Sequence, residues 1–289
     1  MEYLLLSLAA LTSASKGLIC KKIGSETKEN WRVYLLNSVI FLVASLAVLL
    51  YGALCGTLCA PSTFTATLAI GFAALLLFTQ ISETYAMRLG SASVTILIYS
   101  LGLIFPIGYG RIFLSEEISL VQLLGGVLVI MALVFIIDPR GDKKFSTLWL
   151  SLSLLACFGS GMTAVVQKIH QSSDVRGELV VFLAIAFAFA ALFLFLLSVF
   201  SKDKNTSLTL TSDNLKFTLF SGICIGMLNI LNLFLAGKLP AIIQFPIYNI
   251  GSMILTGVGG RLFFGERMPA KKLVGFAVGC VAIIMIGLG

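Results

Sequence analysis

The stretch 98–116, IYSLGLIFPIGYGRIFLSE, decides the fold, because it occurs a second time at 247–266 as IYNIGSMILTGVGGRLFFGE. Ile98 and Ile247 align at an offset of 149 residues, and Glu116 and Glu266 at an offset of 150. An Arg and a Phe precede the Glu in both copies. The chain therefore contains a duplicated unit.

The first apolar run extends the duplication at an offset of 146 residues. The matched residues are Ser7, Leu8, Ala10, Lys22 and Ile23 with Ser153, Leu154, Ala156, Lys168 and Ile169. Membrane proteins built from two hydrophobic copies commonly bind their ligand between the copies. The repeat therefore predicts a functional site at the interface of the two units.

The composition predicts an all-α integral membrane protein. Hydrophobic residues make up 58% of the chain and charged residues only 11%, against about 25% charged residues in soluble domains. Crossing a bilayer takes about 20 apolar residues. Ten runs approach that length: 3–20, 33–51, 65–87, 91–110, 119–137, 148–167, 179–200, 216–237, 241–260 and 270–288.

Five of these ten predicted transmembrane helices fall in each copy. We expect a first unit at 1–138, a polar linker at 139–147 and a second unit at 148–289. An odd number of spans reverses the direction in which the following unit enters the membrane. The prediction is therefore two inverted five-helix repeats.

The basic residues indicate the orientation in the cytoplasmic membrane. Most Lys and Arg lie in or beside the odd-numbered loops: Lys21, Lys22, Lys28, Arg32, Arg88, Arg140, Lys143, Lys144, Lys202, Lys204, Lys216, Arg261, Arg267, Lys271 and Lys272. The positive-inside rule makes these loops cytoplasmic and puts both termini outside. The first run lacks a basic segment before it, so we do not expect a cleaved signal peptide.

With this layout the chain resembles the drug/metabolite transporter superfamily, and within it the EamA-like transporter family. The resemblance covers nearly the whole chain and rests on the five-plus-five layout, the small residues of 89–93, and the ending 111–117 that recurs at 261–266. Ser115 stands where the family usually has Gly. The resemblance implies a secondary carrier working by alternating access, with a central cavity formed largely by the first, third, fourth, sixth, eighth and ninth helices.

The shared ends of the fourth and ninth runs have a structural interpretation. Glu116 and Glu266 precede the fifth and tenth runs, where a carboxylate can cap a helix amino end. We favour this role over contact with a solute. Arg111 and its match have two alternatives, pairing with these carboxylates or contact with lipid headgroups. For Lys168 and its match, extension to the headgroups is the simpler expectation.

The polar residues of the third and eighth runs predict a cavity. At an offset of 149, Gln80 aligns with Asn229 and Glu83 with Asn232; at 150, Thr79 and Ser82 take those places. A spacing of three residues puts each pair on one helix face. Hydrogen bonding between helices is the alternative. Glu83 is a candidate for proton coupling, because burial can raise the pKa of a carboxylate, unless it reaches water at the end of its run.

Further candidates for solute binding lie in the first, fourth and ninth runs. Tyr99 and Tyr248 occupy matched positions, followed by Ser100 and Asn249, and a tyrosine suits either a pocket wall or packing. Lys16 lies inside a run with no basic counterpart in the second copy, which is costly without a role. Pro106, Pro240 and Pro246 predict local helix breaks near the site.

The leading functional hypothesis is a secondary active transporter for a small polar organic solute, such as an amino-acid-like metabolite. A multidrug exporter is the alternative. A channel is harder to exclude. An enzyme is not expected, because the one histidine, His170, falls in a predicted loop and no paired carboxylates lie within the runs. No cofactor, metal ion or nucleic acid is expected as a partner.

Overall fold

The computed structural model of the protein describes residues 2–26, 29–89, 95, 98–136, 146–201, 212–264 and 270–288. These residues are largely helical and contain no strand, which confirms the all-α prediction. The α-helices are α1 (Glu2–Glu26), α2 (Asn30–Cys55), α3 (Thr63–Leu89), α5 (Ile104–Phe113), α6 (Leu120–Ile136), α7 (Thr147–Gln171), α8 (Leu179–Phe200), α9 (Ser212–Ala236), α10 (Ala241–Phe264) and α11 (Ala270–Leu288). The short 3₁₀ helices η1 (Leu101–Leu103) and η2 (Arg176–Glu178) lead into α5 and α8. Each α-helix coincides with one predicted apolar run.

The helices have the length and surface that a bilayer requires. Within the described residues, six stretches are long and apolar enough to cross a membrane: Asn30–Cys55, Thr63–Ala86, Thr147–Gln171, Arg176–Phe200, Leu215–Ala236 and Ala241–Gly259. Ile98–Phe113, Leu120–Ala132 and Leu273–Ile286 are apolar but shorter. Large apolar side chains such as Leu46, Phe193 and Ile284 are exposed on the outside of the bundle. In a bilayer they would contact lipid rather than water.

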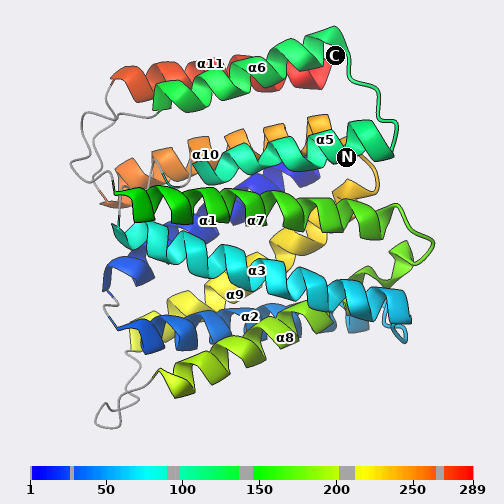
Figure 1. The fold of residues 1–289 in the computed structure, drawn as a ribbon, viewed down its shortest axis with the longest axis vertical. Coiled ribbons are helices and arrows are strands. Elements are labelled where there is room, and N and C mark those ends of the chain that lie inside the picture. The colour runs from blue at the N-terminus through cyan, green and yellow to red at the C-terminus, as the bar shows by residue number, and fades with distance from the viewer. Residues whose placement is uncertain are drawn as a thin grey trace.

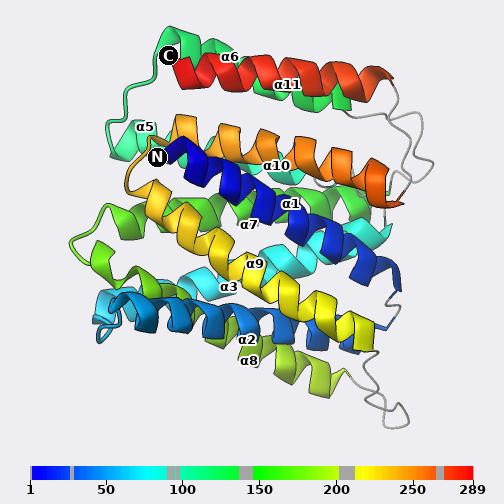
Figure 2. The same cartoon turned by 180° about the vertical axis from the view of Figure 1, so that it is seen from behind.

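The helices lie side by side in one bundle (Figures 1 and 2). α6 packs on α11 at one edge, and α2 packs on α8 at the other. Between these edges, α3 packs on α7 and α1 on α9, while α2 contacts α9 and α3 contacts α8. α1 also packs on α10, as α7 does on α5. In chain order, α1, α2, α3, α5 and α6 correspond to α7, α8, α9, α10 and α11. When each helix is replaced by its counterpart, every packed pair named above becomes another pair of the same set, or the same pair.

Aromatic packing and serine hydrogen bonds join α2 to α8. Phe41 stacks on Phe187 with ring centroids 5.9 Å apart. The hydroxyls of Ser38 and Ser45 donate to the carbonyls of Ala191 and Ala184 at 2.8 and 2.9 Å. Small residues on α2 therefore let the two helices approach closely while both of these buried hydroxyls have a partner.

The bundle has two distinguishable ends. α1 begins and α11 ends at the same end, on the right in Figure 1, which we call the termini end. α3, α6, α8 and α10 also begin there, and the opposite end, on the left in Figure 1, is called the far end. At the termini end, Ser119 and Gln122 cap α6 reciprocally, since each side chain accepts the other residue's backbone N–H at 3.1 Å.

One local expectation is corrected by the structure. The loop assignment of His170 was wrong, because α7 continues to Gln171 and His170 is fully buried against the ring of Phe182, 4.5 Å away between centroids. Cys55 and Cys59 are exposed free thiols. The predicted linker lies almost wholly outside the described residues.

Candidate functional site

A central cavity of about 170 Å³ lies between helices of both halves of the chain. Its lining comes from α1, α3, residues 99–106, α7, α9 and α10, with Phe41 of α2 added. These are the six helices that the resemblance implies. The polar residues that line the cavity are Ser13, Lys16, Thr79, Gln80, Glu83, Tyr99, Ser100, Ser160, Thr163, Gln167, Asn229, Asn232, Tyr248, Asn249, Ser252 and Thr256.

All nine residues that the sequence singles out for solute or coupling lie on this one cavity: Lys16, Gln80, Glu83, Tyr99, Ser100, Asn229, Asn232, Tyr248 and Asn249. The alignment at an offset of 149 fits the cavity best, because Gln80, Glu83, Asn229 and Asn232 all line it whereas Ser82 does not. Contact with a solute stays a prediction for each of them.

Two amides of the lining bond to neighbouring helices. Gln80 of α3 donates from Nε2 to Oδ1 of Asn37 on α2 at 2.9 Å. Asn229 of α9 accepts at Oδ1 from Nε2 of Gln167 on α7 at 3.1 Å. The two alternatives for these residues, cavity lining and hydrogen bonding between helices, are therefore both realised.

The fourth apolar run changes its helix type beside the cavity. Its 3₁₀ segment η1 precedes α5, and the Ser160 hydroxyl of α7 donates to the Tyr99 carbonyl at 3.1 Å. Pro106 has no N–H to donate to the Gly102 carbonyl one turn earlier. A Cβ at Gly102 would lie 2.5 Å from the Cys157 carbonyl oxygen, so only glycine permits this crossing. In the ninth run, by contrast, Pro246 lies inside the continuous helix α10.

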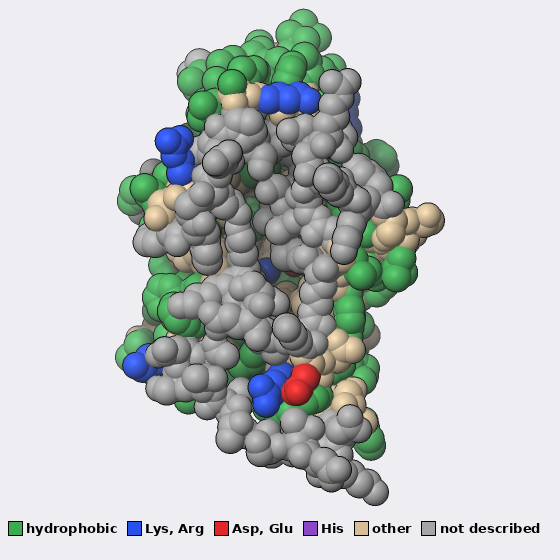
Figure 3. All heavy atoms as spheres, turned by 90° about the vertical axis from the view of Figure 1, so that its left-hand side faces the viewer, with side chains coloured by type: hydrophobic (Ala, Val, Ile, Leu, Met, Phe, Trp, Pro, Cys, Tyr) green, Lys and Arg blue, Asp and Glu red, His purple; other side chains and the backbone are tan. Residues whose placement is uncertain are grey.

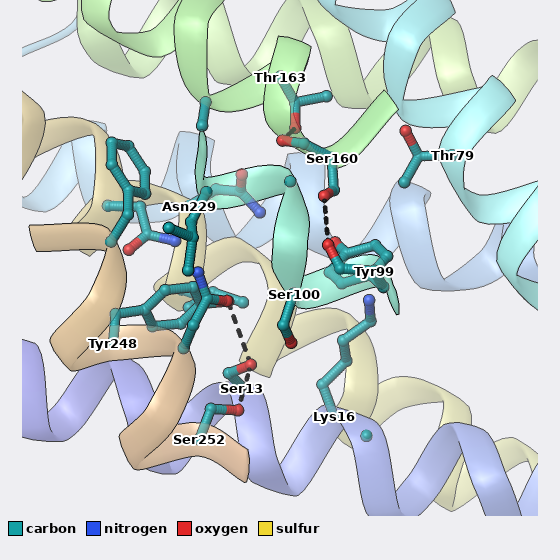
Figure 4. A pocket seen from close by; sticks show the side chains of 18 of the residues that line it. Ser13, Lys16, Thr79, Tyr99, Ser100, Ser160, Thr163, Asn229, Tyr248 and Ser252 are labelled. Atoms are coloured by element: carbon teal, nitrogen blue, oxygen red, sulfur yellow. Dashed lines mark hydrogen bonds between the residues drawn. The ribbon is translucent and has the colours of Figure 1, made fainter. Parts of the chain in front are cut away.

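A hydroxyl network joins α10 to α1 across the cavity wall (Figure 4). The Tyr248 hydroxyl donates to the Ser13 hydroxyl at 3.1 Å, and the Ser252 hydroxyl donates to the same oxygen at 2.8 Å. The Tyr248 side chain is thus held in place by two small residues that the sequence analysis did not single out.

The cavity contains one basic and one acidic side chain, Lys16 and Glu83. Figure 4 shows the Lys16 ammonium group pointing toward Tyr99. Both charges lie within electrostatic range of Tyr99 and Tyr248. Glu83 forms no hydrogen bond or ion pair with another residue of the described chain. The Oδ1 atom of Asn232 is also buried without a hydrogen-bond partner among these residues, and it is an acceptor for a donor group in the cavity.

Sequence reasoning missed six polar residues of the described lining: Ser13, Ser160, Thr163, Gln167, Ser252 and Thr256. Ser160, Thr163 and Gln167 of α7 follow one another at spacings of three and four residues, which places them on one helix face. That spacing was a usable signal. Ser13 and Ser252 gave none, because single serines occur throughout apolar helices with their hydroxyls bonded to the preceding turn.

The charged part of the cavity lies toward the far end. Figure 3 looks onto that end, and atoms of basic and acidic side chains are visible near its centre. Lys16 and Glu83, the charged lining residues, lie beyond the middle of α1 and α3, which run from the termini end to the far end.

A second polar cluster closes the bundle at the termini end. Lys168 of α7, 2% exposed, donates to Glu116 Oε1 at 2.6 Å and to the Leu239 carbonyl at 2.7 Å. The other carboxylate oxygen of Glu116 accepts the N–H of Ala241, the first residue of α10, at 2.7 Å. We call Glu116, Lys168, Leu239 and Ala241 the termini cluster.

The termini cluster corrects the expectations for Glu116 and Lys168, and it leaves contact with lipid headgroups as the open alternative for Arg111. Glu116 does cap a helix, but the helix is α10 rather than the fifth run, which its own serine caps. Lys168 does not extend to the headgroups, because it is buried against Glu116. Arg111 contacts the backbone carbonyl of Glu116 at 3.2 Å, not its carboxylate. The side chain of Lys22 and the whole of Glu266 lie outside the described residues.

Within the described residues, no group of three or more His, Cys, Asp and Glu side chains could hold a metal ion. The helices and the polar cavity define a multi-pass membrane protein whose partners are the lipid bilayer and a small-molecule solute. The family model of the EamA-like transporter family matches residues 1–138, which places the protein in the drug/metabolite transporter superfamily. It is therefore a membrane transporter, as the members of that family are.

The same fold occurs in a crystal structure of a protein with 12% sequence identity. The two chains superpose with a TM-score of 0.75, over 99% of this chain and 96% of the other. No curated protein sequence matches this chain. The family match coincides with the first predicted unit, while the division of the chain into 1–138, 139–147 and 148–289 stays a prediction.

Proposed function

We propose that the protein is a secondary active transporter that moves a small polar organic solute across the cytoplasmic membrane by alternating access. The observation that carries the proposal is the polar cavity, lined by matched helices of both halves of the chain. A solute bound there would contact both units. A movement of one unit against the other would then expose it to either side of the membrane.

The packing of the helices supports two inverted five-helix repeats. When each helix of one unit is replaced by its counterpart in the other, the packed pairs correspond to one another. A twofold relation between the units requires this correspondence. The cavity lining follows the same rule: α1, α3 and residues 99–106 correspond in chain order to α7, α9 and α10. Each unit thus contributes three helices to the site.

The lining suits an amino-acid-like solute. Lys16 offers a cation for a carboxylate, and Glu83 offers an anion for an ammonium group. Asn232 adds a buried acceptor without a partner within the described chain. Pockets for drug-sized ligands occupy about 300–1,000 Å³, whereas this cavity measures about 170 Å³. Its size therefore favours a small metabolite over a multidrug substrate.

Glu83 is our candidate for proton coupling. It is the one acidic residue among those that line the cavity, and it forms no ion pair with a described residue. A carboxylate in this position could exchange its proton for the ammonium group of a solute as the cavity changes sides.

The orientation we propose rests on the sequence, in which 15 of the 20 Lys and Arg fall in or beside the odd-numbered loops. The described basic residues at the far end include Arg32, Lys216, Arg261 and Lys271, each near the end of a helix. Figure 3 shows basic side chains around that end. The positive-inside rule makes it cytoplasmic and puts both termini outside. The charged residues of the cavity, Lys16 and Glu83, would then lie nearer the cytoplasmic end.

Purified protein can test the proposal in two steps. Thermal unfolding in detergent is followed with amino acids, nucleosides, sugars and quaternary amines, and we expect amino acids to raise the unfolding midpoint most. The best solute is then tested in proteoliposomes, where saturable counterflow indicates a carrier. Unsaturable flux without counterflow would indicate a pore and reject the proposal.

Coupling needs a separate measurement. In parent proteoliposomes we expect a pH gradient to drive uphill solute movement. Glu83→Gln should retain counterflow but lose this pH-driven movement, because the amide cannot carry the proton. Transport that stays pH-driven in the variant would exclude Glu83 from coupling.

A further inference from the structure

The termini cluster is a group of polar contacts outside the cavity that joins the two halves of the chain. Glu116 follows α5 in the first half, whereas Lys168, Leu239 and Ala241 belong to α7 and the α9–α10 turn of the second half. From this arrangement we infer that the Glu116–Lys168 pair is the latch that holds the termini end of the cavity closed in this conformation. The inference rests on the proposed alternating-access function.

The termini cluster lies one step beyond the cavity on three helices. On α7, Gln167 lines the cavity and Lys168 is the next residue. On α10, Phe245 lines it, and Ala241 is one turn nearer the termini end. On α5, Pro106 lines it, and Gly110, which faces the Glu116 carboxylate, is one turn further on. A solute leaving toward the termini end would have to pass between these groups.

The latch is strong because each charged group has more than one partner. Lys168 has Glu116 and the Leu239 carbonyl, and Glu116 has Lys168 and the first N–H of α10. The positive end of the helix dipole of α10 adds to the stabilisation of the carboxylate. Removing one member of a buried pair leaves a buried charge and is strongly destabilising, whereas replacing both members is often tolerated. This difference separates the latch role from a general loss of fold.

The backbone before Glu116 is shaped to deliver its carboxylate. Ser115 adopts a left-handed conformation at φ 53°, which turns the chain sharply after α5. The Glu116 N–H then donates to the Gly110 carbonyl at 3.1 Å. A Cβ on Gly110 would lie 2.8 Å from the carboxylate carbon of Glu116, so the glycine leaves the room that the side chain needs.

The test measures access to the cavity from each end and needs no knowledge of the solute. Thr163→Cys on α7 serves as the reporter, in a protein whose six native cysteines are replaced, and a charged, membrane-impermeant thiol reagent is applied to sealed vesicles of either orientation. A protein that keeps only Cys55, exposed at the termini end of α2, identifies the orientation of the vesicles. In the parent reporter we expect slow labelling from the termini side and fast labelling from the far side.

Glu116→Gln and Lys168→Met should each raise the rate of labelling from the termini side by about tenfold or more, since the population of the state open at that end increases when the closed state loses its pair. The matched control is Lys238→Met. Lys238 lies in the same turn but is exposed and contacts the ring of Phe234, 4.4 Å from its centroid. Its removal should leave the rate unchanged.

The double variant Glu116→Gln with Lys168→Met keeps the inference falsifiable if the single variants fold poorly. We expect it to unfold at a higher temperature than either single variant and to keep the raised rate from the termini side. An unchanged rate in a double variant as stable as the parent would overturn the latch, as would equal increases from both sides. An absence of solute counterflow in the parent would instead count against the transport function, and the labelling rates would not reveal it.

Discussion

Two sets of opposite charges lie in the same bundle, and their surroundings differ. At the termini end, Lys168 and Glu116 are 2.6 Å apart and bonded to further backbone groups. In the cavity, Lys16 and Glu83 lie on the surface of an open space, and Glu83 contacts no hydrogen-bonding partner within the described chain. The first set joins helices of the two halves, whereas the second faces a volume that a solute can enter.

The difference separates charges that bond to each other across the two halves from charges that face a volume a solute can enter. A charge inside a membrane protein is costly unless something compensates it. For Glu116 the compensation is visible in the structure. For Glu83 no hydrogen-bonding partner lies among the described residues, and water, a proton or a solute could supply the compensation. The comparison therefore predicts different consequences for removing charges in the two places.

The largest effect should come from the cavity charges. Lys16→Met should weaken solute binding by about 10- to 150-fold, because a hydrogen bond to a charged group contributes about 1.5–3 kcal/mol. The unfolding midpoint of the solute-free protein should change little, since the side chain faces the cavity. The measurement is the dissociation constant of the solute that raises the unfolding midpoint most.

Lys238→Met is the control for this variant, because it removes the same charge from an exposed position outside the cavity. It should bind the solute as the parent does. Equal affinities of Lys16→Met and Lys238→Met would remove Lys16 from the site and abolish the contrast between the two charge sets.

A substitution that disturbs the termini cluster should lower the stability of the protein. Gly110→Ala would force a Cβ against the Glu116 carboxylate, and overpacking of this kind costs about 1–3 kcal/mol. Gly108 lies on the same helix, and a Cβ there would meet open space to a distance of 4 Å, so Gly108→Ala is the matched control. We expect the unfolding midpoint in detergent to fall for Gly110→Ala and to stay or rise for Gly108→Ala. If the unfolding midpoint falls by a similar amount in both variants, the Glu116 carboxylate does not depend on the space beside Gly110.

Much of the fold could be predicted from the sequence, because apolar runs of membrane-spanning length are a local property. Where the prediction stopped too early, a distant contact was the cause. The sixth run was ended near Gln167, before the first charge, yet α7 continues through Lys168 to Gln171. The charge is tolerated there because Glu116 neutralises it, and no local pattern around Lys168 reveals a partner 52 residues away.

The candidate site could be predicted where the two copies repeat a polar pattern. Gln80 and Asn229 were found because they align and each has a second polar residue three positions on. Ser13 has no such pattern, and its role depends on Tyr248, 235 residues along the chain. The different surroundings of the two glutamates, Glu83 and Glu116, also could not be deduced from composition, since only the structure shows which of them has partners.

Tyr248→Phe tests whether the hydroxyl network of the cavity wall belongs with the cavity charges or with the scaffold. The change removes the hydrogen bond to Ser13, which contributes about 0.5–1.5 kcal/mol. We expect solute affinity to fall by about 2- to 10-fold. Tyr109→Phe is the control, because Tyr109 stacks on Phe113 with centroids 5.1 Å apart and does not line the cavity. If both variants lose stability and neither loses solute affinity, the hydroxyl network stabilises the fold and does not contribute to solute binding.

The smallest expected effect concerns the turn that delivers Glu116 to Lys168. Ser115 is the one non-glycine residue of the described chain with a positive φ, 53°, and a side chain is disfavoured in that conformation. Ser115→Gly should therefore raise the free energy of unfolding by about 0.4–1 kcal/mol, because glycine adopts a positive φ without a steric cost. At most other positions glycine lowers stability. Gly56, which follows α2, has a similar φ of 66° and open space around it. It is the control for the opposite change, from glycine to a residue with a side chain. Gly56→Ala should lower the unfolding midpoint by a similar amount. If Ser115→Gly instead destabilises the protein, the serine side chain contributes to the turn, and the latch depends on more than the backbone that places Glu116.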